Sequence, residues 1–380
     1  MKIVIAPDSF KGSMTAIEAA EAMAEGVLEA SAEAELVLLP AADGGEGTLA
    51  ALVASTGGKV VRAVVEDPLG RKITAQYGVL GDQETCVVEL AEASGLTLLA
   101  AEERNPLLAS TYGTGELITH ALDAGYRKFI IGLGGSATND AGIGMLQALG
   151  MKFIDANGVE LGPGTVALNG LSKIDLFGFD KRIMESRFLI ASDVENPLIG
   201  PRGASAVFGP QKGATPEMVQ TLDAILTNFA DIVERFTGTA LHHKKGAGAA
   251  GGAGGAFQAF FLGEMRRGID VVLEAIDFEE QLLDADLILT GEGKTDVQTL
   301  SGKAPFGIAE LAGRHGKPII LISGMVDATA RAQLSPYFTE VHAVTDDGIS
   351  PEESMADAFG HVKIKTRNVM ESYLKTNKLQ

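Results

Sequence analysis

The chain has few of the features that mark secreted or membrane-spanning proteins. It contains one cysteine, Cys86, so no internal disulfide can form. That cysteine lies in an apolar run, residues 85–88, where we expect a buried strand residue rather than a nucleophile. No apolar run approaches the ~18 residues that a membrane span needs. The few apolar residues before Pro7 are too short for a signal-peptide core. We therefore expect a cytoplasmic protein with no membrane partner.

Zinc motifs and an excess of positive charge are also missing. The six histidines are scattered, and the one adjacent pair, His242-His243, has no HExxH-like spacing. The formal net charge of −19 argues against nucleic acid as a partner. A phosphorylated small molecule is still compatible, because its site needs only a local basic group. With 46% hydrophobic and 21% charged residues, the composition is that of a folded globular protein.

Two nucleotide-binding fingerprints are absent. Gly293-Lys294-Thr295 looks like the end of a P-loop, but the Walker A pattern would need glycine at the position of Ile288. The first strand-to-helix turn, residues 6–13, lacks GxGxxG. An ordinary dinucleotide-binding fold is therefore disfavoured.

Both ends of the chain alternate short apolar strands with helices. This alternation predicts parallel strands joined by right-handed crossovers. Neither end has enough strands for a full sheet, but together they supply about five, the usual size. The expected strands are 3–6, 35–39, 287–290, 318–323 and 340–345, and the expected helices are 14–30, 49–55, 302–316 and 354–374. We predict a two-domain α/β protein with a discontinuous Rossmann-like parallel-sheet domain, residues 1–57 plus 285–380.

The middle of the chain, residues 58–284, is predicted to be an inserted α/β domain with a mixed sheet. Residues 59–66 and 72–80 alternate apolar and polar side chains around Asp-Pro-Leu-Gly, which indicates a hairpin. Residues 86–90 can extend that sheet. The Gly/Ala-rich stretch 246–256 fits a linker or a tight loop that leads into a helix.

Two polar loops at opposite ends of the chain carry the strongest functional signal. Residues 6–13 and 290–296 each follow an apolar strand and combine glycine, lysine and carboxylates. In open α/β sheets, ligands bind at the carboxyl ends of strands. These loops therefore suit a site that handles phosphate and a divalent metal. Their candidate side chains are Asp8, Ser9, Lys11, Glu292, Lys294 and Asp296.

Three loops of the middle segment offer further candidates. The glycines of residues 132–140 allow backbone N–H groups to approach an anion, although such a loop is often a simple turn. Asp193 follows a strand and could accept a proton in phosphoryl transfer, or simply cap a turn. Lys212 is a third loop lysine, and most loop lysines are solvated. The candidates of the glycine-rich loop are Gly134, Gly135, Ser136, Thr138 and Asn139.

Six motifs in fixed order resemble the bacterial type 1 glycerate kinase family over essentially the whole chain. They are PDSFKGS, DGGEGT, GLGGSATND, ASDVENPL, GAGAAGG and TGEGKTDVQTLSGKAP. The resemblance implies ATP-dependent phosphorylation of D-glycerate with Mg²⁺. It also implies a two-domain α/β protein with its active site in the cleft between the domains. The family is more often associated with the 2-phosphate product than with the 3-phosphate.

Phosphoryl transfer needs a base, neutralised charge and in-line positioning, which suggests roles for these residues. We expect Asp193 to be the base and Lys11 to contact phosphate or the glycerate carboxylate. Glu292 and Asp296 are candidate Mg²⁺ ligands. Asp43 and Glu46 of the DGGEGT motif are alternatives for the base or metal role. Substrate or phosphate contacts are expected from Asp8, Ser9, Lys11, Asp43, Gly134, Gly135, Ser136, Thr138, Asn139, Lys212 and Lys294.

Two other functions compete with a small-molecule kinase. A sensor that binds phosphorylated metabolites could use the same scaffold, but it has no need of so many carboxylates at strand ends. An NAD-linked oxidoreductase is disfavoured by the missing dinucleotide fingerprint. The sequence leaves the oligomeric state open, with a homodimer as one possibility.

Overall fold

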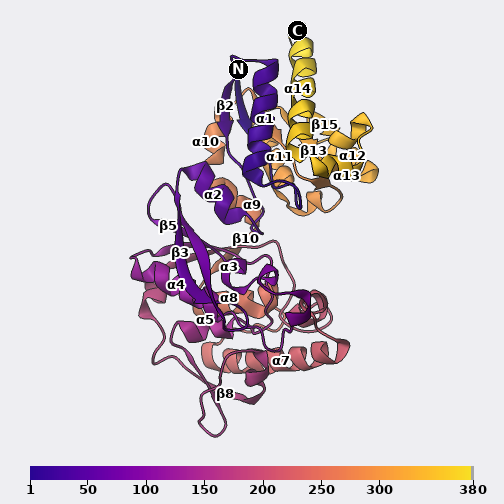
Figure 1. Cartoon of the computed structure of the whole chain (residues 1–380). Helices are drawn as coiled ribbons and strands as arrows, with labels where there is room; N and C mark the ends of the chain where they lie inside the picture. Colours follow the sequence, from indigo (N-terminus) through magenta and orange to yellow (C-terminus); the bar gives the residue numbers. More distant parts are fainter. Residues whose placement is uncertain (378–380) are drawn as a thin grey trace. The chain divides into compact units, whose positions relative to one another are not determined.

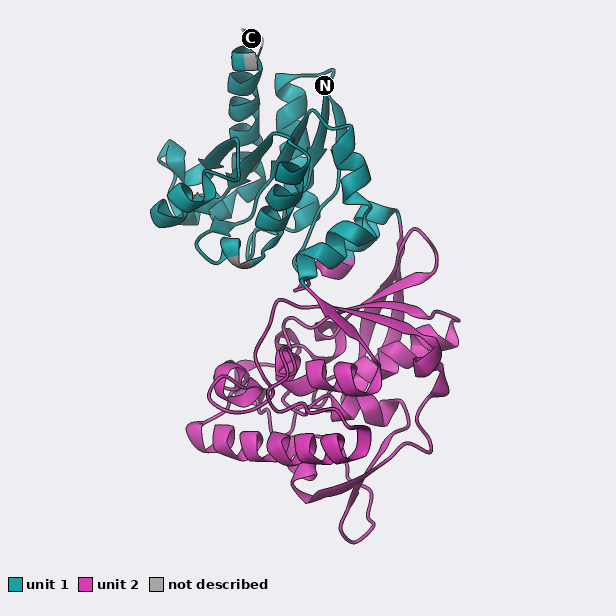
Figure 2. Cartoon of the chain, turned by 180° about the vertical axis from the view of Figure 1, so that it is seen from behind, with its two compact units in different colours: residues 1–43, 50–57, 267–380 teal, residues 44–49, 58–266 magenta. Residues whose placement is uncertain are grey.

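A computed structural model describes residues 1–377, which form two compact units (Figure 1). Unit 1 comprises residues 1–43, 50–57 and 267 onward, and unit 2 comprises residues 44–49 and 58–266 (Figure 2). The units differ from the expected domain boundaries at residues 44–49 and 267–284, so those boundaries stay predictions. The cleft expected between the domains also stays a prediction.

Unit 1 is built on a parallel sheet whose strands come from both ends of the chain. They are β1 (Lys2–Ile5), β2 (Glu35–Leu38), β11 (Leu287–Thr290), β13 (Ile319–Ser323) and β15 (Glu340–Ala343). The order is β15-β13-β11-β1-β2, and every neighbouring pair is parallel. Every residue of the central strand β11 is buried, as expected for a sheet covered on both faces. The predicted five-stranded sheet is thereby confirmed.

Helices cover this sheet on its two faces. They are α1 (Ala16–Ala30), α9 (Gly268–Ala275), α10 (Phe278–Leu283), α11 (Ala304–Arg314), α12 (Ala328–Leu334), α13 (Pro351–Ala356) and α14 (Ala358–Asn377). Helices α1 and α14 lie side by side on one face, which Figure 1 shows clearly. Their close approach requires glycine at position 26, because a Cβ there would lie 2.4 Å from the carbonyl oxygen of Lys363. Helix α11 contacts β11 and β13.

Two helix ends show how local sequence sets the boundaries. Thr15 caps α1 in a capping box with Glu18, so the helix begins at Ala16. The single closing helix expected over residues 354–374 is wrong. Asp357 has φ −134° and ψ 60°, which ends α13, and its Oδ1 accepts a hydrogen bond from the N–H of Gly360. The carboxylate therefore acts as the cap at which α14 begins.

Unit 2 contains the predicted mixed sheet. Its strands are β3 (Lys59–Glu66), β4 (Lys72–Val79), β5 (Thr85–Glu89), β6 (Lys128–Gly132), β9 (Arg187–Ala191) and β10 (Glu264–Arg266). The order is β10-β9-β6-β5-β4-β3, with β10, β9, β6 and β5 parallel and the β3–β4 hairpin antiparallel. Cys86 is fully buried in β5, as the apolar run predicted.

The remaining elements belong to both units, and residues 50–57, 294–295 and 325–326 among them lie in unit 1. They are α2 (Thr48–Thr56), α3 (Ala91–Ser94), α4 (Tyr112–Asp123), α5 (Ile143–Ala148), β7 (Lys152–Asp155), β8 (Leu171–Asp175), α6 (Ala204–Phe208), α7 (Pro216–Thr237), α8 (Ala253–Phe260), β12 (Lys294–Thr295) and β14 (Met325–Val326). The Gly/Ala-rich stretch is a buried turn that leads into α8, so the linker alternative is wrong. Within residues 1–377, no helix is both long and apolar enough to cross a membrane.

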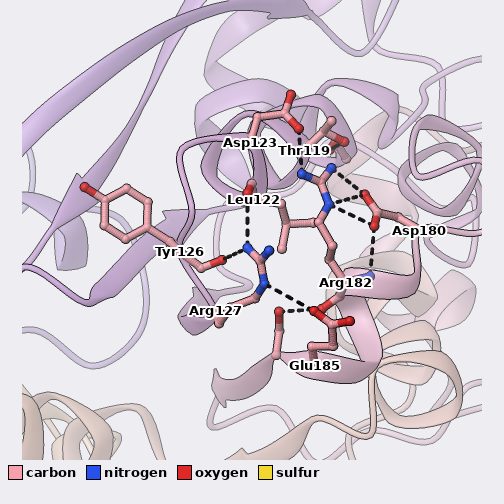
Figure 3. A network of polar contacts seen from close by, with 10 residues as sticks. Thr119, Leu122, Asp123, Tyr126, Arg127, Asp180, Arg182 and Glu185 are labelled. Atoms are coloured by element: carbon pink, nitrogen blue, oxygen red, sulfur yellow. Dashed lines mark hydrogen bonds and ion pairs between the residues drawn. The ribbon is translucent and has the colours of Figure 1, made fainter.

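The amino ends of β6 and β9 are held by a network of paired charges (Figure 3). The guanidinium of Arg182 donates to both oxygens of Asp180 and, at 2.7 Å, to Asp123 at the end of α4. Arg127 donates to two backbone carbonyls and lies 3.9 Å from Glu185. Because these charges are paired with one another, we interpret the network as one that stabilises the fold of unit 2.

Candidate active site

A pocket of about 260 Å³ lies at the carboxyl edge of the unit 1 sheet. Residues that follow each of the five strands line it, the arrangement expected for open α/β sheets. Seven candidates from the sequence meet there, namely Asp8, Ser9, Lys11, Asp43, Glu292, Lys294 and Asp296. Apolar side chains complete the wall, namely Phe10, Met325, Met355 and Val362. The two loops from opposite ends of the chain therefore form one pocket.

Asp8 is the most perturbed carboxylate of this pocket. It follows β1 after Ala6 and Pro7 and is 7% exposed. Burial, and then the negative charge of Asp43, raises the pKa of Asp8 to about 7, even though the N–H of Ser9 donates to its Oδ1 at 2.6 Å. The charge of Lys11 opposes this rise without cancelling it. An ionised Asp8 beside Asp43 therefore favours a bound cation.

Glu292 is held in a fixed orientation by three donors. Its Oε1 accepts hydrogen bonds from the hydroxyls of Thr295 at 3.0 Å and Thr299 at 2.6 Å. Its Oε2 accepts from Lys303 Nζ at 3.2 Å. Burial raises the pKa of Glu292 nevertheless, because these donors only partly offset the desolvation. Sequence reasoning did not single out Lys303, although the GKAP end of the last motif contains it.

The exposed lysines of the pocket complement its carboxylates. Lys294 Nζ lies 3.9 Å from Asp296 Oδ2, and the Lys294 side chain is largely exposed. Lys11 is also exposed and acts on Asp8 through its charge. Together with Lys303 they place three ammonium groups along one pocket. The pocket can therefore take a ligand that carries negative charge as well as a metal ion.

The other candidates belong to unit 2, where the glycine-rich loop follows β6. Ser136, Thr138 and Asn139 are all buried in this loop. Gly135 has φ +72°, a conformation in which glycine is favoured. A Cβ at Gly134 would lie 2.8 Å from the Cα of Gly45, so the loop packs directly on the DGGEGT segment.

Residues 44–49, which include the DGGEGT motif after Asp43, lie over the carboxyl ends of the parallel strands of unit 2. Gly44 has φ +87°, and a Cβ there would lie 2.9 Å from the carbonyl oxygen of Ala191 at the end of β9. Glu89, at the end of β5, accepts the N–H of Leu49 at 2.6 Å and also a hydrogen bond from the Gly47 backbone. Burial raises the pKa of Glu89 to about 7. Glu89 was missed because nothing local distinguishes it from other strand-end carboxylates.

Asp193 and Lys212 occupy contrasting positions in unit 2. Asp193 follows β9 and is exposed. Lys212 is 1% exposed, so the solvated role considered for it is wrong. Its Nζ donates to Ser136 Oγ at 2.8 Å and to the carbonyl of Thr138 at 2.6 Å. Burial lowers the pKa of Lys212 to about 7, with the charge of Asp140 opposing.

The carboxylates of the unit 1 pocket fit a divalent cation such as Mg²⁺. Among the described residues, no group of three or more His, Cys, Asp and Glu side chains could hold a metal by itself. Mg²⁺ does not need such a group, since it commonly binds one or two carboxylates together with water and substrate phosphates. The mutual repulsion of Asp8 and Asp43 is the kind of unbalanced charge that a cation relieves.

The sequence is similar to those of known proteins over nearly its whole length. The model of the glycerate kinase family matches residues 3–374. The chain belongs to the glycerate kinase family. It is 46% identical over 372 residues to a glycerate kinase of Bacillus subtilis, covering 98% of this chain and 97% of the relative. It is 44% identical over 369 residues to the glycerate 2-kinase of Escherichia coli, covering 97% of each.

A solved structure extends the similarity from sequence to fold. A protein of Salmonella typhimurium LT2, assigned as glycerate kinase 2, has a crystal structure that matches with a TM-score of 0.90. The two chains are 44% identical, and the match covers 100% of each. The glycerate kinase family resemblance and the two-domain α/β fold class predicted from the sequence are therefore confirmed.

Proposed function

We propose that this enzyme transfers the γ-phosphoryl group of ATP to D-glycerate, with Mg²⁺, and that 2-phosphoglycerate is the product. The observation that carries the proposal is the unit 1 pocket, in which carboxylates and lysines gather at the carboxyl edge of a parallel sheet. Membership of the glycerate kinase family supports the reaction. The name of the Escherichia coli relative, a glycerate 2-kinase, supports the 2-phosphate.

The carboxylates of the pocket are assigned to the metal. A bound Mg²⁺ would neutralise charge on the phosphate oxygens. Glu292 and Asp296 were the ligands expected from the sequence, but Glu292 already accepts three hydrogen bonds. Asp8 and Asp43 repel each other when both are ionised, so they gain more from a cation. We therefore place Asp8 and Asp43 ahead of Glu292 as ligands.

The glycine-rich loop is assigned to phosphate. Its glycines let the main chain approach an anion without a Cβ in the way, and Ser136 adds a hydroxyl. Lys11 is assigned to the carboxylate of glycerate or to a phosphate oxygen, because its ammonium is exposed. Backbone donors and a lysine ammonium are the usual means of holding a transferring phosphoryl group.

Asp193 is assigned as the base. The attacking hydroxyl oxygen of glycerate forms a bond to the γ-phosphorus as the bond to the β-phosphate oxygen breaks, and the proton of that hydroxyl passes to the Asp193 carboxylate. ADP leaves with the former bridging oxygen. The exposure of Asp193 keeps its carboxylate accessible to a substrate hydroxyl.

A cytoplasmic location and a homodimer also stay predictions.

A coupled assay with D-glycerate, ATP and Mg²⁺ tests the function. ADP is read through pyruvate kinase and lactate dehydrogenase, and the product is read separately through enolase without phosphoglycerate mutase. We expect glycerate-dependent ADP together with an enolase signal. ADP without an enolase signal would mean the 3-phosphate. No glycerate-dependent ADP would overturn the kinase assignment and favour a sensor that binds without turnover.

A further inference from the structure

The buried ammonium of Lys212 reaches two positions on the glycine-rich loop. It donates to Ser136 Oγ and to the carbonyl of Thr138, so it bridges both sides of Ala137. The segment that carries it is fixed in turn. Gly213 has φ +91°, and a Cβ there would lie 2.3 Å from the carbonyl oxygen of Arg104. Lys212 thus links a closely packed segment to the loop.

A second segment packs on the same loop. Gly251, in the Gly/Ala-rich stretch, has φ +64°, and a Cβ there would lie 2.0 Å from the carbonyl oxygen of Thr138. Its own carbonyl accepts the N–H of Ala141 at 3.0 Å. Asp140 adds a buried anchor, because its Oδ2 accepts both the N–H and the hydroxyl of Thr111 at 2.8 Å. The loop is therefore held by buried partners over several consecutive residues.

Stability does not explain why one of these partners is a lysine. Burying an ammonium against two neutral acceptors carries a desolvation cost that an apolar side chain of similar length would avoid. The pKa of Lys212, lowered to about 7 by burial, reflects that cost. The ammonium adds directed hydrogen-bond donors and positive charge on the buried side of a loop rich in backbone N–H groups. Both the donors and the charge favour binding of an anion by this loop.

We propose that Lys212 is a positioning residue that fixes Ser136 and the Thr138 backbone in the conformation that receives phosphate, without itself touching the substrate. This inference rests on the proposed kinase function. It assigns Lys212 a different role from the direct phosphate contact expected from the sequence. Misplacement of a substrate-binding group by about 1 Å can cost 10²-fold in rate, so the effect of losing Lys212 is large.

Double-variant kinetics test the proposal. We expect Lys212→Met to lower kcat/KM for ATP by about 100-fold, and Ser136→Ala to lower it less. If Lys212 acts through Ser136 and its loop, the double variant loses no more than Lys212→Met alone, because contacting residues are not additive. Lys128→Met is the matched control, since that lysine is 57% exposed and pairs with Glu84 at the other end of β6. Its kinetics should be unchanged.

Two kinetic results would overturn the proposal. A folded Lys212→Met enzyme with wild-type kinetics would mean that the ammonium has no role in the reaction. Losses that multiply in the double variant would mean that Lys212 acts on the substrate directly. Circular dichroism and thermal melting establish that the compared variants are folded.

A measurement on the wild-type enzyme covers the case in which Lys212→Met does not fold. Lysines are acetylated with a limiting amount of acetic anhydride and identified by mass spectrometry, with and without ATP, Mg²⁺ and D-glycerate. We expect Lys212 to be unmodified in both states, while the exposed Lys11 and Lys294 react in the free enzyme. Reaction of Lys212 in the free enzyme with protection by ATP would overturn the positioning role. The labelling needs no turnover, so a failure of the kinase assignment is recognised separately, by the coupled assay.

Discussion

The carboxyl edges of the two sheets share an architecture and differ in chemistry. At the edge of unit 1, acidic side chains and exposed lysines line a pocket. At the edge of unit 2, two glycine-containing segments pack backbone against backbone, with a lysine ammonium buried behind them. Parallel strands bring loops together in both cases, but the loop residues decide what is bound. The unit 1 pocket offers carboxylates to a metal ion and lysines to an anion, whereas the unit 2 loop offers donors to an anion.

Buried ionisable groups occur at both edges, with acidic groups in unit 1 and groups of both signs in unit 2. Desolvation raises the pKa of Asp8 and of Glu89 to about 7, and it lowers the pKa of Lys212 to about 7. Each group is therefore less stable in its charged form than it would be in water. In unit 1 a metal ion can compensate that cost, whereas in unit 2 the compensation comes from hydrogen bonds within the fold. Substitutions made in one unit at a time test this difference.

The largest effect is expected from Asp193→Asn. An amide cannot accept the hydroxyl proton, so kcat should fall by about 10²–10⁴-fold, the usual contribution of a positioned base. The KM for glycerate should change little. Steady-state kinetics with the coupled assay measure both.

Glu195→Gln is the control for this variant, because Glu195 lies two residues away and its exposed side chain pairs with Lys245. It should keep wild-type turnover. Undiminished turnover in Asp193→Asn would remove Asp193 from the base role and direct attention to Asp43 and Glu46.

The next effect concerns stability and pH at the unit 2 edge. The pKa of Glu89 is raised on folding, so between about pH 4 and pH 7 the folded state binds more protons than the unfolded state. Its contribution to stability is therefore lost as pH rises through this range, by up to roughly 3 kcal/mol for a shift of this size. Glu89→Gln should flatten the dependence. Urea unfolding at several pH values measures it.

Lys212 should show the opposite sign in the same experiment. Its pKa is lowered on folding, so the unfolded state binds the extra proton between about pH 7 and pH 10. Its contribution to stability therefore increases as pH rises through that range, and Lys212→Met should remove the increase.

A Glu89→Gln enzyme with the same pH profile as the wild type would show that the Glu89 carboxyl is solvated and contradict its buried position.

The smallest effect is expected at the amino edge of unit 2, in the network of Figure 3. Arg182→Met removes the ion pairs with Asp180 and Asp123, which are partly exposed. We expect a loss of about 1 kcal/mol in unfolding free energy and no change in kcat or KM. Reduced kcat in a fully folded Arg182→Met enzyme would mean that the network at the amino ends of the unit 2 strands affects the groups at their carboxyl ends.

The sheet of unit 1 and its pocket were predictable because the signals are local. Each strand is a short apolar run that leads into a polar loop, and both Asp8 and Glu292 lie in such loops shortly after their strands end. Parallel pairing then brings the loop residues to one edge without further information. The discontinuous sheet followed from counting strands, since neither end of the chain could complete a sheet by itself.

What could not be predicted depends on packing between distant segments. The burial of Lys212 comes from contact with Ser136 and Thr138, more than 70 residues away, while its local sequence, Gly-Pro-Gln-Lys-Gly, is typical of an exposed turn. The role of the Gly/Ala-rich stretch likewise depends on the close approach of Gly251 to the glycine-rich loop. The β7–β8 hairpin also went unpredicted, because neither strand was recognised in the sequence.

The claim that the cation binds at the carboxyl ends of the unit 1 strands is tested most directly by comparing metal binding in one variant from each unit. Mn²⁺ can replace Mg²⁺ as a paramagnetic probe, and its binding to the enzyme without substrates can be followed by electron paramagnetic resonance. We predict that Asp8→Asn weakens Mn²⁺ binding at least 10-fold, whereas Ser136→Ala leaves it unchanged. Equal Mn²⁺ affinity in Asp8→Asn and the wild type, or a loss confined to Ser136→Ala, would contradict the assignment of the cation to unit 1.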